Sequence, residues 1–359
     1  MKRIALMGLI VLGMVIGIEQ VEAADLYVPS GYLTIQTAID AAITGDTVWV
    51  ADGTYTGTGN KDLTWSGKHI TVKSVNGSVT CIIDCENSGR GFCFSNLGIG
   101  DTIEGFTIRR GSATDGGCGI YCEASSPNII NCTILQNSGG NYENGGGGIF
   151  CNNNSSPNIT NCIISENTAI GYGGGIYCWD NSSPSITNCI ISGNSSNGGG
   201  GGIFCWDGSS PQIINCTISQ NKSMSAGGGI ALNSSPQITN CVISENSANN
   251  NSQGGGIFCH YNSSPQITNC VISGNSANGG GGISWWNGSS PQITNCIILQ
   301  NVAVGGGGVY CEENTHYTYT NNNCWGNAPN NYYRGISDQT GLNGNISQNP
   351  QFVGGADFH

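Results

Sequence analysis

The stretch GGGIYCWDNSSPSITNCIISGN, from Gly173 to Asn194, returns almost unchanged as GGGIFCWDGSSPQIINCTISQN, from Gly200 to Asn221. The tripeptide SSP occurs in seven copies of this unit, with prolines 30, 27, 27, 25, 29 and 26 residues apart. These prolines are Pro127, Pro157, Pro184, Pro211, Pro236, Pro265 and Pro291. An eighth, degraded copy begins at Gly305 and ends with NNC at Cys324. A period of this length indicates a repeat architecture.

Each copy contains three short apolar runs separated by turn residues. In the copy that starts at Gly200, these runs are GGIFC, PQIIN and CTIS. Runs this short and rich in Ile and Cys are typical of strands, and alternation points their Ile and Cys side chains to one face. One coil of three strands cannot bury its apolar centre alone, but stacked coils can. The repeats therefore predict an all-β fold, a right-handed parallel β-helix (solenoid) with ~4.8 Å between coils.

A different pattern precedes the repeats. In LTIQTAIDAAITGDTVWVADGTY, Thr34 is a plausible helix N-cap, and an apolar stripe follows it on one helical face. The stripe consists of Ile35, Ala38, Ile39 and Ala42. We expect this short helix to cover the open N-terminal end of the first coil, where strand edges would otherwise be unpaired. Strands at TVWVA, HITVKS, TCIID and FTIRR add about two irregular coils to the eight regular ones, giving about ten.

The chain divides into four predicted segments: 1–23 a signal peptide, 24–115 the N-terminal cap and irregular first coils, 116–327 eight regular repeats of about 27 residues, and 328–359 a C-terminal segment that we expect to be truncated. Lys2 and Arg3 precede an apolar run, and small residues near Ala23 suit a cleavage site. A membrane anchor is the alternative interpretation of this run. The signal peptide predicts an exported chain, extracellular or at the cell surface. Because no second apolar stretch follows, we expect no membrane span in the mature chain, which we also expect to be a monomer.

The charge balance excludes one class of partner. The 359 residues contain 10 Lys and Arg against 22 Asp and Glu, a formal net charge of −12. Between Gly116 and Asn327 the one basic residue is Lys222. Phosphate recognition needs clustered Lys and Arg, so nucleic acid and anionic membrane are poor candidates.

The N-terminal stretch TIQTAIDAAITGDTVWVADGTY resembles the opening of secreted right-handed β-helix proteins of the pectin-lyase-like superfamily. The repeats are similar to the coils of bacterial surface members of that group. They are also similar to polymorphic outer-membrane proteins, whose GGAI and FxxN motifs become GGGI and ISEN here (Ile164 to Asn167). The resemblance implies the fold but not one chemistry, since this fold is used by lyases, hydrolases, epimerases and adhesins.

Most of the 18 cysteines fall into two columns. One column follows an Asn: Cys132, Cys162, Cys189, Cys216, Cys241, Cys270, Cys296 and Cys324. The other ends the GGGI strand: Cys122, Cys151, Cys178, Cys205, Cys259 and Cys311. An exported chain with an even count suggests disulfides. However, Leu232 and Trp285 replace the second column's cysteine in two coils that keep the first, so we favour unbridged apolar core residues.

Asparagine forms two rows at fixed distances from these cysteines. One row directly precedes the first cysteine column, from Asn131 to Asn323, and suits the left-handed backbone of a tight corner. The other lies five residues after it, from Asn137 through Asn301. Stacked amides can also form a hydrogen-bonded ladder. We interpret both rows as structural.

The resemblance implies where an enzyme of this group would carry its residues. Its lyases place Asp ligands for calcium beside an Arg or Lys, and its polygalacturonases carry NTD, DD, GHG and RIK segments, none of which occurs here. The single basic pair that could supply such an Arg or Lys is Arg109 and Arg110, with Asp101 and Asp115 nearby in sequence. A capping salt bridge is the favoured interpretation of that pair. No catalytic residue, metal site or cofactor is assigned, with calcium as the cofactor if the chain is a lyase.

The most suggestive pattern lies on the outer face of the GGGI strand. An aromatic residue stands between the Ile and the Cys in six coils: Tyr121, Phe150, Tyr177, Phe204, Phe258 and Tyr310. The next outward position holds Trp179, Trp206, His260 and Trp286, and Asp180 and Asp207 follow two of these tryptophans. Exposed aromatic columns can stack on sugar rings, so these last six residues are the candidate binding site. Alternatively, the aromatics shield the sheet and the aspartates serve turns.

The sequence leaves two functions open. One is a secreted or cell-surface protein that binds polysaccharide, a glycan or another surface partner through the outer aromatic stripe, without catalysis. The other is a polysaccharide lyase or hydrolase acting on polymers that contain uronic acid. The scarcity of Lys and Arg favours the first.

Overall fold

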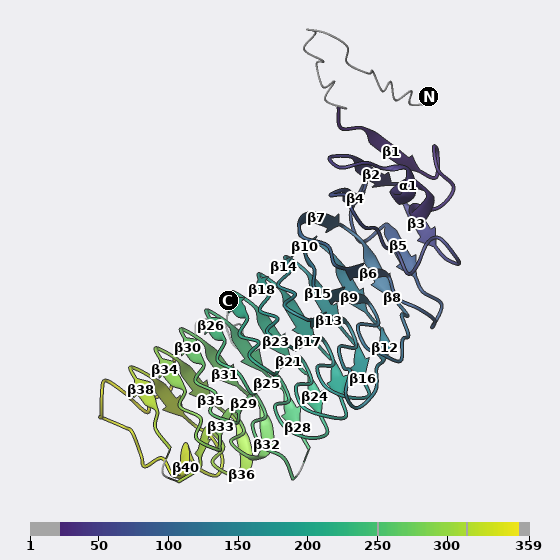
Figure 1. The fold of residues 1–359 in the computed structure, drawn as a ribbon. Helices are drawn as coiled ribbons and strands as arrows, with labels where there is room; N and C mark the ends of the chain where they lie inside the picture. Colours follow the sequence, from purple (N-terminus) through teal and green to yellow (C-terminus); the bar gives the residue numbers. More distant parts are fainter. Residues whose placement is uncertain (1–21, 250, 314, 352–359) are drawn as a thin grey trace.

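The computed structural model describes residues 22–249, 251–313 and 315–351, and the predicted signal peptide lies almost wholly outside them. The described chain winds into a long solenoid whose coils follow one another from the N-terminal to the C-terminal end (Figure 1). All strand pairs of the long sheets are parallel, and the coils make about 11 turns. The predicted right-handed β-helix of about ten coils is confirmed.

Three long parallel sheets run along the solenoid, and a fourth, short sheet accompanies them between Ser138 and Gly305. The first sheet has 12 strands: β1 (Asp25–Val28), β2 (Thr47–Val50), β4 (Thr71–Ser74), β7 (Ile99–Glu104), β10 (Ser126–Ile130), β14 (Asn158–Thr160), β18 (Ser185–Thr187), β22 (Gln212–Ile214), β26 (Gln237–Thr239), β30 (Gln266–Thr268), β34 (Gln292–Thr294) and β38 (Thr318–Thr320). The second has 11: β3 (Gly53–Tyr55), β5 (Cys81–Asp84), β8 (Thr107–Arg109), β11 (Thr133–Leu135), β15 (Ile163–Ser165), β19 (Ile190–Ser192), β23 (Thr217–Ser219), β27 (Val242–Ser244), β31 (Val271–Ser273), β35 (Ile297–Leu299) and β39 (Asn323–Trp325).

The third sheet, built from the GGGI strands, has 10 strands: β6 (Phe92–Ser95), β9 (Ile120–Glu123), β13 (Ile149–Asn152), β17 (Ile176–Cys178), β21 (Ile203–Cys205), β25 (Ile230–Leu232), β29 (Ile257–Cys259), β33 (Ile283–Trp285), β37 (Val309–Cys311) and β40 (Tyr332–Arg334). The fourth was not predicted and has seven very short strands: β12 (Ser138–Gly139), β16 (Thr168–Ala169), β20 (Ser195–Ser196), β24 (Lys222–Ser223), β28 (Ser247–Ala248), β32 (Ser276–Gly279) and β36 (Val302–Gly305).

The core is a set of aligned columns. In the first sheet Ile213 faces Ile238, and in the second Ile218 faces Ile243; all four side chains are fully buried. In the third sheet, Ile203 and Cys205 point inward, as the alternation predicted. Each coil therefore contributes only a thin slice of apolar surface, and the stack buries it.

The predicted N-terminal helix is present as α1 (Ile35–Ala41). The Thr34 side chain caps it by accepting a hydrogen bond from the Thr37 backbone N–H, at 3.3 Å. Ile35, Ala38 and Ile39 are fully buried and join the core. As expected, α1 lies at the N-terminal end of the solenoid, beside β1 and β2 (Figure 1).

The second asparagine row forms a continuous buried ladder. The side chains of Asn137, Asn167, Asn194, Asn221, Asn246, Asn275 and Asn301 are all fully buried. Asn221 is typical: its Oδ1 accepts the backbone N–H of Asn194, and its Nδ2 donates to Ile191 O at 2.8 Å and to Asn246 Oδ1 at 3.0 Å. The ladder thus pairs backbone groups that each corner would otherwise leave without partners.

The first asparagine row shapes the outer corner, with one exception. Seven of its members have φ between 53° and 57°, the left-handed region: Asn131, Asn161, Asn188, Asn215, Asn240, Asn269 and Asn295. In the last coil the prediction was wrong, because Asn321 takes the corner (φ 55°) and Cys324 pairs with Ile298. Asn322 occupies the slot opposite Cys296, where its Oδ1 accepts the Cys296 N–H at 2.8 Å. The buried amide, rather than the NNC string, sets the register there.

All 18 cysteines are unpaired, and 17 are buried. Burial raises the pKa of Cys81 and of Cys85 to about 12, which keeps both thiols protonated at neutral pH. In the second cysteine column, Leu232 pairs with Cys205 and Cys259 in register, and Trp285 is fully buried. Cysteine therefore serves here as a small apolar core residue.

The basic pair Arg109 and Arg110 forms a salt bridge, as favoured. Its partner is Asp84, and not Asp101 or Asp115. Arg109 Nε lies 2.9 Å from Asp84 Oδ2, and the Arg110 guanidinium lies 2.7 Å from the same oxygen. Burial alone would raise the pKa of the Asp84 carboxyl, but hydrogen bonds from Arg110, the Glu86 amide and Arg109 lower it below its usual value. Asp101 instead accepts from Trp65 and His69, and Asp115 pairs with Arg90. Strand register brings Asp84 beside Arg109 across the second sheet.

We expect Asn221→Ala to lower the free energy of unfolding by about 3 kcal/mol or more, because it leaves several buried polar groups unpaired. Asn215→Gly is the matched control: Asn215 is exposed at φ 54°, and glycine accepts that backbone conformation. Urea unfolding of both variants measures the difference. Equal stability of the two variants would contradict a structural role for the ladder.

We expect the thiols to be free but shielded. Iodoacetamide should label the native protein at Cys93 at most, because Cys93 is the one partly exposed cysteine. After denaturation without a reducing agent, mass spectrometry should find all 18 cysteines alkylated. Seven or more disulfides in that sample would overturn this assignment.

Candidate functional site

Most of the first aromatic column on the outer face of the third sheet is covered, not exposed as predicted, and Tyr121 and Phe258 are half-buried. Phe150, Tyr177 and Phe204 are at most 4% exposed and form a second hydrophobic cluster outside the main core. The glycine run of each coil lies against the base of these rings. At Gly200 (φ +66°) an added Cβ would lie 2.8 Å from the Cβ of Phe204 and would collide with the Ile203 carbonyl. The glycines therefore let the backbone close over the column.

The rings of the second aromatic column pack against those of the first and reach solvent. Tyr177 and Trp179 stack with ring centroids 6.3 Å apart and planes 1° apart. Phe204 and Trp206 lie 5.7 Å apart, and Trp206 is 37% exposed. Further along, His260 stacks on Phe258 at 5.3 Å. Each of these three outer rings therefore packs against an inner ring of its own coil.

One coil interrupts both columns. At β25, Ala231 replaces the inner aromatic, pairing in register with Phe204 and Phe258, and Asn233 takes the outer position. Its turn reads LNSSP where the preceding coil reads CWDGSSP, so it is two residues shorter. The missing rings leave a groove of about 490 Å³ between Trp206 on one side and His260 on the other.

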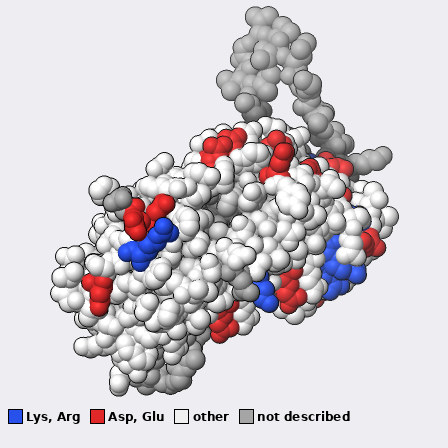
Figure 2. All heavy atoms as spheres, turned by 90° about the horizontal axis from the view of Figure 1, so that it is seen from below, with Lys and Arg blue, Asp and Glu red and all other residues white. Residues whose placement is uncertain are grey.

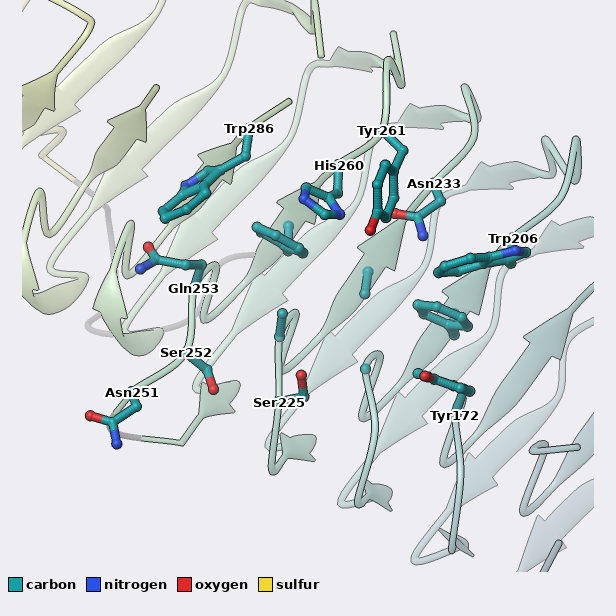
Figure 3. Close-up of a pocket in the computed structure, with 15 residues that line it drawn as sticks. Tyr172, Trp206, Ser225, Asn233, Asn251, Ser252, Gln253, His260, Tyr261 and Trp286 are labelled. Atoms are coloured by element: carbon teal, nitrogen blue, oxygen red, sulfur yellow. The ribbon is translucent and has the colours of Figure 1, made fainter. Parts of the chain in front are cut away.

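Figure 3 shows how this aromatic groove is lined. Trp206, Tyr261, His260 and Trp286 lie along one edge, and Tyr172, Ser225, Asn251, Ser252 and Gln253 lie along the other. Asn251, Ser252 and Gln253 come from the segment that follows β28. A smaller hollow of about 290 Å³ adjoins it and shares Tyr172 and Trp206. The smaller hollow is completed by Tyr142, Glu143, Tyr177 and Trp179.

The aromatic groove is uncharged. Its lining contains no Asp, Glu, Lys or Arg. Burial lowers the pKa of His260, although Glu312 opposes the shift, so the imidazole is neutral at pH 7. Its Nε2 lies 2.6 Å from Asn287 Nδ2. On the face of the molecule shown in Figure 2, charged side chains stand in small separate groups on a largely uncharged surface.

The structure brings together four of the six predicted site residues. Trp206, His260 and Trp286 line the aromatic groove, and Trp179 lines the smaller hollow. Asp180 and Asp207 line neither; each sits in a turn with φ of 50° or 51°, and each carbonyl accepts a backbone N–H from the preceding coil. Their position matches the alternative interpretation, that they serve turns. Sequence reasoning missed Tyr172, Asn233, Gln253 and Tyr261, although the proline spacings of 25 and 29 marked the irregular coils.

Among the described residues, no group of three or more His, Cys, Asp and Glu side chains is placed to hold a metal ion. Within residues 22–249, 251–313 and 315–351, no helix has the length and apolarity needed to cross a bilayer.

Comparison with known proteins identifies relatives of the fold. A sequence model of the family described as right handed beta helix region matches residues 43–201, 169–296 and 201–355. The pectate lyase Pel9A is similar with a TM-score of 0.50 and 15% identity, over 84% of this chain and 78% of its own. The PL6-family alginate lyase AlyGC has a TM-score of 0.42 and 12% identity, over 83% and 51%. The pectin methylesterase from Aspergillus niger has a TM-score of 0.40 and 14% identity, over 90% and 93%. Curated proteins gave no significant match.

The turn role of Asp207 is testable by two substitutions. Asp207→Asn should change the free energy of unfolding by less than about 0.5 kcal/mol, because Asn tolerates the left-handed backbone. Asp207→Val should cost about 1–3 kcal/mol, because a β-branched residue is strained at φ 51°. Thermal unfolding of both variants measures this. If the charge loss in Asp207→Asn proves as costly as Asp207→Val, the turn role is wrong.

Proposed function

The chain belongs to the right-handed β-helix family, and from this premise we propose that it is a secreted or cell-surface protein that binds polysaccharide without catalysis. The binding surface is the aromatic groove together with the smaller hollow. Export would follow from cleavage of the predicted signal peptide after Ala23.

The observation that carries the proposal is a concave surface with aromatic walls and a rim of amides and hydroxyls. Flat rings can stack on the apolar faces of sugars, at about 1 kcal/mol per aromatic beyond area burial. Asn233, Ser252 and Gln253 offer donors and acceptors to sugar hydroxyl groups. Such a pocket, mostly apolar with a few convergent polar groups, is typical of binding sites.

The alternative, a lyase or hydrolase of uronic acid polymers, requires a base and a cation at the reacting sugar. Among the groove-lining residues the one ordinary acid–base group is His260, and none is Lys or Arg. Pel9A has a similar fold at 15% identity, a level that supports shared architecture alone. Binding without turnover is therefore the function that these residues support best.

Substitutions in the groove should weaken binding and leave the fold intact. We expect Trp206→Ala, and more strongly the Trp179→Ala and Trp206→Ala pair, to weaken polysaccharide binding at least about tenfold, or ~1.4 kcal/mol. Ala231→Phe should have a similar effect, because it restores the missing ring and fills the groove. Tyr27→Ala is the matched control, an aromatic 48% exposed on β1 at the N-terminal end.

Affinity electrophoresis against a panel of acidic and neutral polysaccharides measures binding, and assays for reducing ends and unsaturated uronates measure turnover. Binding that survives Trp206→Ala and Ala231→Phe would place the site elsewhere. Turnover on any polymer would establish the enzyme instead.

A further inference from the structure

We infer that the ligand of the aromatic groove is a neutral polysaccharide, without carboxylate or sulfate groups, that extends along the solenoid axis. This inference rests on the proposed function and narrows it to one class of glycan. It differs from the substrates named for pectate and alginate lyases of similar fold, which are acidic.

The polar groups of the groove suit hydroxyl groups. They are side-chain amides and hydroxyls, from Asn233, Asn251, Gln253, Ser225 and Ser252. Gln253 Oε1 and Trp286 Nε1 are buried and have no hydrogen-bond partner within the described residues. One is an acceptor and the other a donor, and a sugar hydroxyl group can serve both. The two side chains lie on opposite edges of the groove, and small movements of each would let a ligand satisfy them.

Cations that could recognise a carboxylate are missing from the lining. Acidic ligands are bound by Arg or Lys, often in bidentate pairs, or by a metal ion. Lys222 is the one basic residue between Gly116 and Asn327, and it lines neither hollow. Arg334 donates to the Tyr310 hydroxyl at 2.7 Å and lies 3.9 Å from Glu313, so its charge is already engaged.

The charges that do surround the groove are negative. Glu143 lines the smaller hollow, and Glu312 accepts a hydrogen bond from the Asn287 N–H at 2.6 Å, next to His260. Asp207 directly follows Trp206, and the whole chain has a net charge of −12. Like charges repel one another, and in 0.1 M salt this repulsion is screened over about 10 Å. A polyuronate bound in the groove would be repelled by these carboxylates.

The groove is also too long for a single sugar. Strands β17, β21, β25, β29 and β33 are successive neighbours, so Trp179 and Trp286 are separated by four coil spacings. At ~4.8 Å each, these spacings add to roughly 19 Å. An oligosaccharide that occupies both hollows would use all four outer rings, and a monosaccharide would use one or two.

The decisive comparison uses two probes with the same backbone. Polygalacturonate and its fully methyl-esterified form differ in charge, and galactomannan and xyloglucan extend the neutral set. At about 0.02 M salt we expect at least one neutral polymer to bind at least tenfold more tightly than polygalacturonate or alginate, and we expect this ratio to shrink at about 0.5 M salt. Tighter binding of either polyuronate, abolished by Trp206→Ala, would overturn the inference and leave the proposed function standing. Binding to no polymer would overturn both.

A gain-of-binding variant tests the electrostatic cause. Asn233→Arg places a cation on the groove, where no side-chain hydrogen bond of Asn233 within the described residues is lost. We expect it to raise affinity for polygalacturonate at least about fivefold at low salt, whereas the uncharged control Asn233→Gln should not. Thermal unfolding of both variants checks that the fold is retained. Equal polygalacturonate binding by the two folded variants would show that charge is not the selective factor.

Discussion

The buried asparagine ladder is the interaction on which the rest of the solenoid depends. Each amide accepts from the coil before it and donates to the coil after it, so no rung is satisfied unless the coils stack in register. Register in turn aligns the Ile columns of the core and the aromatic columns outside it. Coil length can therefore vary only at the corners, where added or missing residues do not interrupt the ladder. There the spacing changes between 25 and 30 residues without displacing a single core column.

Most of the fold could be predicted because its signals are local and repeated. Alternating Ile and Cys fixed the inward faces, and Thr34 fixed the start of α1. The fourth sheet was missed because strands such as Lys222–Ser223 carry no apolar signal; they form because neighbouring coils present matching backbone groups. The register at Cys324 was missed because Asn322 takes the slot that a cysteine holds in the preceding coils, and its Oδ1 accepts the Cys296 N–H. Both errors concern pairing between coils, which no single repeat reveals.

The candidate site was partly predictable for a related reason. A sequence pattern shows rings that are present, so Trp206, His260 and Trp286 stood out. The groove, however, is created by what Ala231 and Asn233 lack, and its polar rim comes from a segment of unremarkable composition around Gln253. The covering of Phe204 was equally invisible, since it depends on where the glycine run of its coil folds back. The number of aromatic residues at outward positions of the sequence therefore overstated how much aromatic surface reaches solvent.

The short turn at β25 has an evolutionary consequence. The solenoid is periodic, and a single coil with a shortened turn leaves the neighbouring coils in place, as a point defect does in a crystal lattice. Here the defect is the groove itself, which results from a turn that is two residues shorter and from the absence of two rings, at Ala231 and Asn233. Unequal recombination between near-identical repeats could duplicate the shortened coil or move it along the solenoid by whole coils. The protein could thereby acquire a second groove, or a longer one, without redesign of its core.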